Sequence, residues 1–275
     1  MMKRVFALML AVLMLCTLVA CSGDEDNGVT DDPVIDVEIK LPTYTDSNGD
    51  TFTYEYLNST SVKITGFSGS DEPHLVTIPA YIVEEVKIEG DKTEQVQKTV
   101  AEIADSAFFA NSNISDIKCE ADLTGIGRYA FAYCEALLTV ELPDTLKTIG
   151  DGAFYNCSAL TSVDLGSGIQ TIGDHVFANC AELSAIAFPA SLQSIGAYTF
   201  AECVALTAIE LPEGVVSVGA QAFYNCTSVE KLTLPATLTE IGKWAFNPVV
   251  RTLPDEAITV VEGSKAAEHI AQFRP

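Results

Sequence analysis

The sequence is short of basic residues. It contains 15 Lys and Arg against 38 Asp and Glu, which gives a net charge of −23 at pH 7. A nucleic-acid-binding protein needs a basic surface, and a surface of the opposite sign also repels anionic lipid headgroups. The composition therefore argues against nucleic acid as a partner, and the acidic surface is explained by solubility and mutual repulsion.

Histidine is also scarce. The three histidines, His74, His175 and His269, fall in different parts of the chain, so they cannot converge on one catalytic or metal site. The sequence contains no phosphate-binding loop, no nucleophile elbow and no His/Cys set with metal-ligand spacing. We therefore predict a protein that is not an enzyme and that holds no cofactor and no metal.

Long hydrophobic runs are absent beyond the N-terminus. There, Lys3 and Arg4 precede an apolar run from Phe6 to Leu15. This run is too short to span a bilayer, so residues 1–20 are predicted to be a signal peptide. The following Leu18-Val19-Ala20-Cys21 resembles a bacterial lipobox, which implies cleavage before Cys21, lipidation of Cys21 and membrane attachment through the lipid. Ordinary secretion is the alternative.

Residues 21–36 are predicted to be an acidic flexible tether. The stretch 22–28 directly behind the cysteine, SGDEDNG, resembles the surface-export signal of some Gram-negative anaerobes. This resemblance implies an outer membrane lipoprotein that is exposed on the cell surface. The alternative is a plain spacer on a lipoprotein that faces the periplasm.

A repeat of 23 residues fills the centre of the chain. The pentapeptide AFYNC occurs at 153–157 and again at 222–226, and phenylalanine, cysteine and glycine recur with the same period. Each unit has an L-x-x-V-x-L pattern typical of a short strand, a glycine that needs positive φ or close approach, and a segment predicted to be one helical turn. A unit this small cannot bury its own apolar face, so the units are predicted to stack as a solenoid.

The unit resembles the BspA-type leucine-rich repeat, whose pattern is roughly L-x-x-I-x-L-P-x-x-L-x-x-I-G-x-x-A-F-x-x-C. The match runs from about Ile103 to Phe246. Together with the repeat pattern, the resemblance predicts an α/β leucine-rich repeat solenoid with a parallel β-sheet on one side and short helical turns on the other. It further implies a bacterial surface lipoprotein or adhesin.

Both ends of such a stack must be covered. The chain is predicted to divide into the signal peptide (1–20), the tether (21–36), a β-rich N-terminal cap (37–100), the repeats (101–248) and a short helical C-terminal cap (249–275). The N-terminal cap contains two predicted hairpins, with turns at Asn48-Gly49 and Gly90-Asp91. The C-terminal cap contains a predicted strand at 258–261 and a helix from Ser264 to Phe273.

An alternation of oxygen-bearing residues, Asp46, Asn48 and Asp50, raises the possibility of a calcium loop. Thr51 and Leu57 stand where an EF-hand needs glycine and a carboxylate. We therefore interpret the stretch as a plain turn.

The cysteine column at 134, 157, 180, 203 and 226 has three interpretations. Zinc needs four converging thiolates, and a straight row does not converge. Disulfides between neighbouring turns are conceivable at strand spacing, but one cysteine would stay unpaired and parallel Cβ vectors fit the bond poorly. The favoured interpretation is a row of buried, inert thiols that donate to backbone carbonyls. Cys119 stands in the strand-leucine column and is predicted to be core.

Two surfaces are candidates for binding. The first is the outward face of the strands, which carries Asp116, Lys118, Thr139, Glu141, Ser162, Asp164, Glu210 and Lys231. It contains no aromatic residue, whereas protein-interface hot spots favour Trp, Tyr and Arg. The second is the aromatic side, which carries Tyr129, Tyr155, Tyr198, Tyr224 and Trp244, with Phe109 and Tyr133 beside them. Half-buried packing over the turns is the alternative explanation for these rings.

We therefore predict a non-enzymatic, lipid-anchored surface protein that mediates macromolecular binding or adhesion, with a protein or glycan ligand. One alternative is an accessory glycan-binding lipoprotein whose aromatic residues stack on sugar rings. Another is a structural envelope protein without a ligand.

Overall fold

The computed structural model describes residues 41–88 and 92–273 of the chain. They belong to one compact unit, Leu41–Pro275. The predicted signal peptide, the lipidation site Cys21 and the tether lie outside the described residues. Within these residues, no helix has the length and apolar character that crossing a membrane requires.

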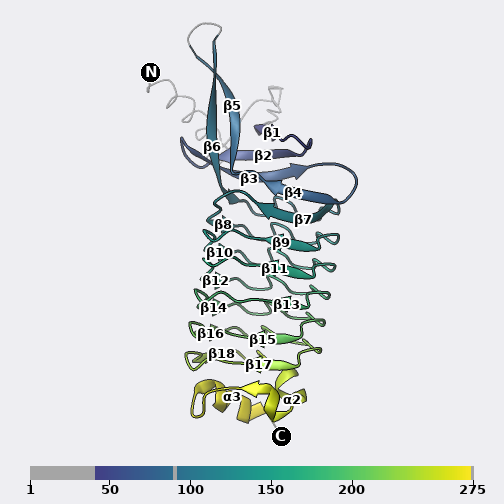
Figure 1. Ribbon diagram of the computed structural model, residues 1–275, viewed down its shortest axis with the longest axis vertical. Coiled ribbons are helices and arrows are strands. Elements are labelled where there is room, and N and C mark those ends of the chain that lie inside the picture. Colours follow the sequence, from purple (N-terminus) through teal and green to yellow (C-terminus); the bar gives the residue numbers. More distant parts are fainter. Residues whose placement is uncertain (1–40, 89–91, 274–275) are drawn as a thin grey trace, which may run out of the picture. The chain divides into compact units, whose positions relative to one another are not determined.

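Each repeat forms one coil of a solenoid (Figure 1). The L-x-x-V-x-L segments give the first strand of each coil: β7 (Ile114–Cys119), β9 (Thr139–Glu141), β11 (Ser162–Asp164), β13 (Ala185–Ile186), β15 (Ala208–Glu210) and β17 (Lys231–Thr233). The two residues before the repeated glycine of each coil form its second strand: β8 (Gly125–Ile126), β10 (Thr148–Ile149), β12 (Thr171–Ile172), β14 (Ser194–Ile195), β16 (Ser217–Val218) and β18 (Glu240–Ile241). Neighbouring coils pair in parallel and in register, with Val140 opposite Val163 and Ile149 opposite Ile172. The predicted leucine-rich repeat solenoid is confirmed.

The interior of the stack is organised by a column of phenylalanine rings. Successive rings lie 4.7 to 5.5 Å apart, centre to centre, and are nearly parallel. Every ring is at most 2% exposed; the column is Phe108, Phe131, Phe154, Phe177, Phe200, Phe223 and Phe246. These centre-to-centre distances are typical of offset aromatic stacking. Each coil therefore covers the apolar face of the one before it.

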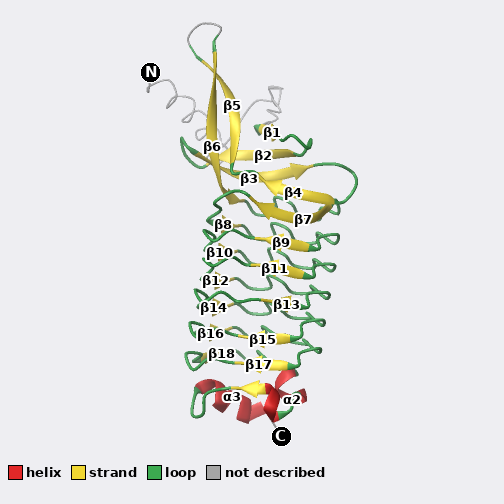
Figure 2. Cartoon of the chain, in the orientation of Figure 1, coloured by secondary structure: helices red, strands yellow, loops and turns green. Residues whose placement is uncertain are grey.

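The segments that carry the phenylalanines differ in one detail from the expected helical turns. They are runs of overlapping β-turns, drawn as loop in Figure 2. In one coil Ala153 N donates to Gly150 O (3.2 Å) and Cys157 N to Phe154 O (3.3 Å). Gly152 and Asn156 have φ of 63° and 57°, which an α-helix does not allow. The turns let alternate amides bond to the next coil, as Phe154 N does to Val176 O (2.9 Å).

The glycine column is required by close approach between coils. A Cβ added at Gly219 would lie 2.4 Å from the amide nitrogen of Ala197, and one at Gly242 would lie 2.2 Å from that of Ala220. Both contacts are with backbone, which cannot move aside. Any larger residue here would push two coils apart.

The N-terminal cap is built from β1 (Thr43–Thr45), β2 (Thr51–Tyr56), β3 (Ser61–Ser68), β4 (His74–Ile78), β5 (Tyr81–Lys87) and β6 (Thr93–Ile103). The antiparallel pair β1–β2 confirms the first predicted hairpin. The antiparallel pair β5–β6 confirms the strand pairing of the second, whose predicted turn at Gly90-Asp91 lies outside the described residues. Strand β6 pairs with β8 and β4 pairs with β7, both in parallel, so the cap extends each ladder of the solenoid.

The C-terminal cap comprises α2 (Val249–Thr252), a short 3₁₀ turn (Asp255–Ala257), β19 (Ile258–Thr259) and α3 (Lys265–Phe273). Strand β19 pairs with β17, as the predicted last strand should. Ser264 caps α3 by accepting a hydrogen bond from Ala267 N at 3.2 Å. Val249 follows the cysteine column and is 1% exposed, so it ends the column with an apolar contact.

A buried carboxylate links the first hairpin to β4. Asp50 is 1% exposed, and its Oδ1 lies 2.8 Å from Nε2 of His74. The other ring nitrogen, Nδ1, lies 3.0 Å from the carbonyl oxygen of Glu72. Within the described residues Asp50 Oδ2 has no hydrogen-bond partner. A buried carboxylate is costly unless it is paired, so the ring of His74 offsets the charge of Asp50.

This pair predicts a pH dependence of stability. Burial alone would lower the pKa of His74, but its hydrogen bonds to Glu72 and Asp50 outweigh burial and raise the pKa above 6.5. The contribution to stability is therefore complete below pH 6.5 and is lost as the pH rises through the folded-state pKa. Urea unfolding of the wild type and of His74→Gln measures this contribution. We expect the free energy of unfolding of the wild type minus that of the variant to be largest below pH 6.5 and to fall as the pH rises above 6.5.

His269 in α3 supplies the control. Burial lowers the pKa of this imidazole below 6.5, so its contribution is present above that pH and is lost as the pH falls. The difference between wild type and His269→Gln should thus shrink on acidification. A difference for His74→Gln that does not change with pH would contradict the interpretation of the Asp50–His74 pair.

Candidate binding surfaces

The cysteine column lies inside the stack, and its thiols are buried. Each thiol donates to the backbone carbonyl of a phenylalanine in the preceding coil at 3.2 to 3.3 Å; the donors are Cys134, Cys157, Cys180, Cys203 and Cys226. All six cysteines of the described part of the chain are free. Burial raises the pKa of the Cys180 and Cys226 thiols to about 12. The favoured interpretation of the column, buried donors to backbone carbonyls, is confirmed.

The outward face of the strands is divided. Strands β4, β7, β9, β11 and β13 form one parallel sheet, whereas β15, β17 and β19 form another. The predicted binding residues are therefore not on one continuous sheet: Asp116, Lys118, Thr139, Glu141, Ser162 and Asp164 lie on the first, and Glu210 and Lys231 on the second.

Phe188 stands shortly after β13, where the first sheet ends. The first coil has Cys119 at this position and the remaining coils have leucine, such as Leu165 and Leu211, each at most 4% exposed. The larger ring of Phe188 is only half-buried and lies edge-on against Phe200 at 5.6 Å. The amide of Leu142 bonds to Asp164 O at 2.9 Å, but among the described coils Leu165 and Phe188 do not form the corresponding bond to the next coil.

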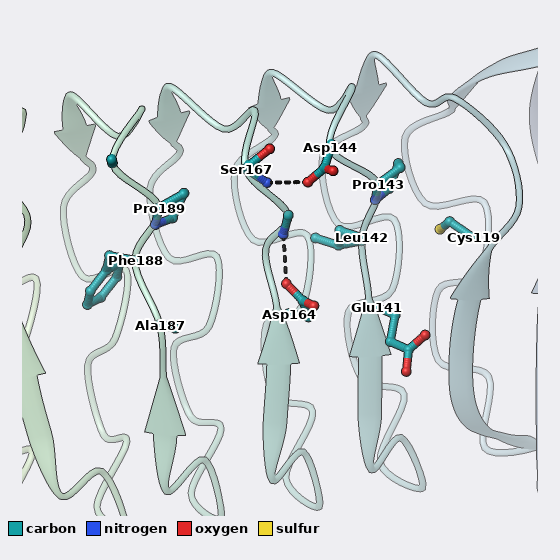
Figure 3. Close-up of a pocket in the computed structure, with 12 residues that line it drawn as sticks. Cys119, Glu141, Leu142, Pro143, Asp144, Asp164, Ser167, Ala187, Phe188 and Pro189 are labelled. Carbon is teal, nitrogen blue, oxygen red and sulfur yellow. Dashed lines mark hydrogen bonds between the residues drawn. The ribbon is translucent and has the colours of Figure 1, made fainter.

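An open groove lies close to the end of the first sheet, next to its last strand β13. It has a volume of about 580 Å³ and crosses the chain segments that follow β9, β11 and β13 (Figure 3). Its lining combines the carboxylates of Glu141, Asp144 and Asp164 with apolar side chains that include Phe188. The structure thus brings Glu141 and Asp164, both predicted binding residues, to one concave site.

Gly166 shapes the groove. It stands where the neighbouring coils have Pro143 and Pro189, and both prolines line the groove. Gly166 has φ of 64°, and a Cβ there would lie 2.8 Å from Pro143 O. Two backbone amides in this turn are held by carboxylates: Ser167 N donates to Asp144 Oδ1 at 2.7 Å and Gly166 N to Asp164 Oδ1 at 3.0 Å. Because Gly166 has no side chain where the neighbouring coils have a proline ring, space is left in the groove at this position.

On the turn side, exposed aromatic residues gather over the first coils. Phe109 is 49% exposed, and Tyr129 and Tyr133 are each 41% exposed. The ring of Tyr133 lies 5.4 Å from that of Phe109 and 5.5 Å from that of Tyr155. The exposed Arg128 directly precedes Tyr129 in the chain, and its Nε lies 4.0 Å from Oδ2 of Asp151. We call Phe109, Arg128, Tyr129, Tyr133 and Tyr155 the aromatic patch.

The other predicted aromatic residues lie apart from this patch or in packed positions. Tyr198 is half-buried and stacks on His175 at 4.8 Å. Tyr224 is half-buried one coil further on. Trp244 is 43% exposed, but Lys243 Nζ covers its ring at 4.3 Å from the centre. These three rings therefore do not form one surface with the patch.

Sequence reasoning missed Asp144, Ser167 and Phe188 as groove residues. The signal was present in the repeat columns, where Gly166 interrupts the prolines and Phe188 interrupts the leucines. Within the described ranges, no group of three or more His, Cys, Asp or Glu side chains is placed to hold a metal ion.

The stacked coils, the two parallel ladders and the buried phenylalanine and cysteine columns define a leucine-rich repeat protein. A family model described as the BspA type leucine rich repeat region matches residues 76–206 and 193–252, in six copies. These ranges cover more than half of the chain. The chain belongs to the BspA-type leucine-rich repeat family.

Several solved structures are similar to this chain. A leucine-rich cell surface protein of Faecalibacterium prausnitzii is 28% identical with a TM-score of 0.60, covering 75% of this chain and 52% of that one. The leucine-rich repeat protein of T. pallidum is 25% identical with a TM-score of 0.63, covering 81% and 92%. A leucine-rich repeat protein of Eubacterium ventriosum, 19% identical with a TM-score of 0.59 over 80% and 51%, shares the fold.

The chain spans about half the length of the Faecalibacterium protein. No curated protein matches it. Leucine-rich repeat proteins of this family and fold are typically non-catalytic.

The cysteine column predicts slow thiol chemistry. A rise in pKa from 9.0 to about 12 lowers the thiolate fraction near neutral pH by roughly a thousandfold. We expect iodoacetamide to alkylate Cys180 and Cys226 at least about a hundredfold more slowly in the folded protein than in denaturant. Peptide mass spectrometry after timed quenching measures each site. Equal rates in the two states would show that these thiols are not buried donors.

Proposed function

We propose that the protein is a non-enzymatic, lipid-anchored protein of the bacterial cell surface that binds another protein through the aromatic patch. The anchor is assigned to Cys21, because Leu18-Val19-Ala20-Cys21 resembles a lipobox. The surface location is supported by the related Faecalibacterium chain, a leucine-rich cell surface protein. The acidic stretch behind Cys21 supports export to the outer face of the outer membrane.

The aromatic patch is the observation that carries the binding role. Tyr and Arg are enriched among the residues that dominate protein-interface energies, and the patch combines Tyr129 and Tyr133 with Arg128. Its side chains stand on a rigid stack, since Tyr129 N and Tyr133 N bond to the next coil at 3.0 and 2.8 Å. A preorganised surface loses little conformational entropy on binding.

The glycan-binding alternative receives less support. Stacking on a sugar requires an open ring face, and Lys243 covers one face of Trp244. In the patch, the rings of Phe109 and Tyr133 meet at 60° and those of Tyr133 and Tyr155 at 63°, so each edge blocks part of a neighbouring face. This geometry suits interlocking with protein side chains better than a flat sugar.

The test is binding to a panel of immobilised matrix proteins and bacterial surface proteins. We expect Phe109→Ala/Tyr133→Ala to weaken the strongest interaction at least about tenfold, because hot-spot aromatic residues each contribute on the order of 1–2 kcal/mol. Surface plasmon resonance measures the dissociation constants.

Trp244→Ala is the matched control, since it removes an exposed aromatic residue outside the patch. It should leave protein binding unchanged. Wild-type binding to sugars on a glycan array that Trp244→Ala abolishes would favour the glycan-binding alternative instead. Complete protection of the protein from protease added to intact cells would contradict the surface location.

A further inference from the structure

The groove between β9 and β13 carries three carboxylates that form no ion pair within the described part of the chain. They belong to Glu141, Asp144 and Asp164, which are all exposed. Glu141 and Asp164 lie directly opposite each other on paired strands, where like charges are destabilising. Lys118 faces Glu141 on the next strand without forming an ion pair with it. Such an arrangement favours a cation supplied from outside.

The same groove offers apolar surface beside the carboxylates. Pro143 and Pro189 flank the turn at Gly166, and the half-buried ring of Phe188 lies next to Pro189 (Figure 3). Lysine and arginine have long apolar stems and charged ends. A stem can lie on the proline and phenylalanine surface while its charged end reaches a carboxylate.

The backbone around the groove also has unused hydrogen-bonding capacity. Where other coils are joined by bonds such as Leu211 N to Thr233 O at 3.0 Å, the carbonyl of Ala187 receives no bond from Leu165 within the described coils. Ala187 is exposed and lines the groove. An unbonded carbonyl at the surface can accept a hydrogen bond from a donor group of a ligand.

The open shape of the groove indicates which kind of ligand it can bind. Sites for small molecules bury most of the ligand surface in a cleft, whereas this groove is shallow and runs across several coils. We propose that the groove binds an extended, lysine- or arginine-bearing segment of a partner protein. Charged ends pair with Glu141 and Asp164, and the apolar stems rest on Pro143, Pro189 and Phe188. The acidic chain, with its net charge of −23, speeds the approach of such a segment.

The experiment uses two fluorescein-labelled peptides and the purified full chain. One peptide alternates lysine with valine, and the other has glutamate in place of every lysine. Fluorescence anisotropy should show binding of the lysine peptide alone, with an affinity that falls as salt is added. Absence of binding by the lysine peptide at low salt would overturn the proposal.

Two variants separate the groove from the general acidity of the chain. Glu141→Gln/Asp164→Asn removes two groove charges and keeps an oxygen to accept the bond from Gly166 N, so the turn is preserved. We expect it to bind the lysine peptide roughly tenfold more weakly. Ala190→Trp fills the groove without changing its charge, and should weaken binding at least as much.

The matched control is Glu135→Gln/Glu182→Gln, which removes two exposed carboxylates that form no ion pair among the described residues and do not line the groove. It should bind the lysine peptide like the wild type. An equal loss in this control would show that net charge alone attracts the peptide. Unchanged binding by Glu141→Gln/Asp164→Asn would place the peptide elsewhere. Circular dichroism and thermal unfolding show that each variant is folded.

Discussion

The contact between one coil and the next is the interaction on which the rest of the structure depends. A coil of 23 residues has too little interior of its own, and it gains one only when the neighbouring coil covers its apolar face. The stacked phenylalanine rings, the amides that bond from coil to coil and the thiols that donate to carbonyls all cross this boundary. The glycine column permits it, because at Gly242 even a Cβ would meet the backbone of the coil before.

This constraint separates the residues that hold the stack from those that face a partner. Positions such as Phe177 and Cys180 are fully buried and must fit both neighbours. Positions that project outward, such as Tyr133 and Asp164, bear no such restriction, so a surface can vary without loss of the coil. The groove arises where framework positions themselves vary. Gly166 replaces a proline and Phe188 replaces a leucine of the repeat, and together they leave a hollow between adjacent coils.

Much of the fold could be predicted from the sequence because the repeat aligns chemically equivalent residues. The columns of Phe154 and Cys157 indicated the stacked rings and the buried donors, and Asn48-Gly49 indicated the first hairpin. The left-handed turn residues, such as Tyr129 and Tyr198 with φ of 53° and 57°, were not predicted, because hydrogen bonds from their amides to the next coil hold them there against local preference. The groove was missed for a related reason: it arises from single departures in two columns whose effects meet only in three dimensions.

The most direct test of this account is a pair of deletions followed by urea unfolding. Removing residues 158–180 deletes one repeat of 23 residues and joins the remaining coils in phase. Removing residues 158–177 deletes a shorter segment and leaves the later phenylalanines out of phase with the earlier ones. We expect the in-phase deletion to fold cooperatively with somewhat lower stability and the out-of-phase deletion to lose its cooperative transition. Equal folding of both chains, or unfolding of the in-phase deletion, would contradict it.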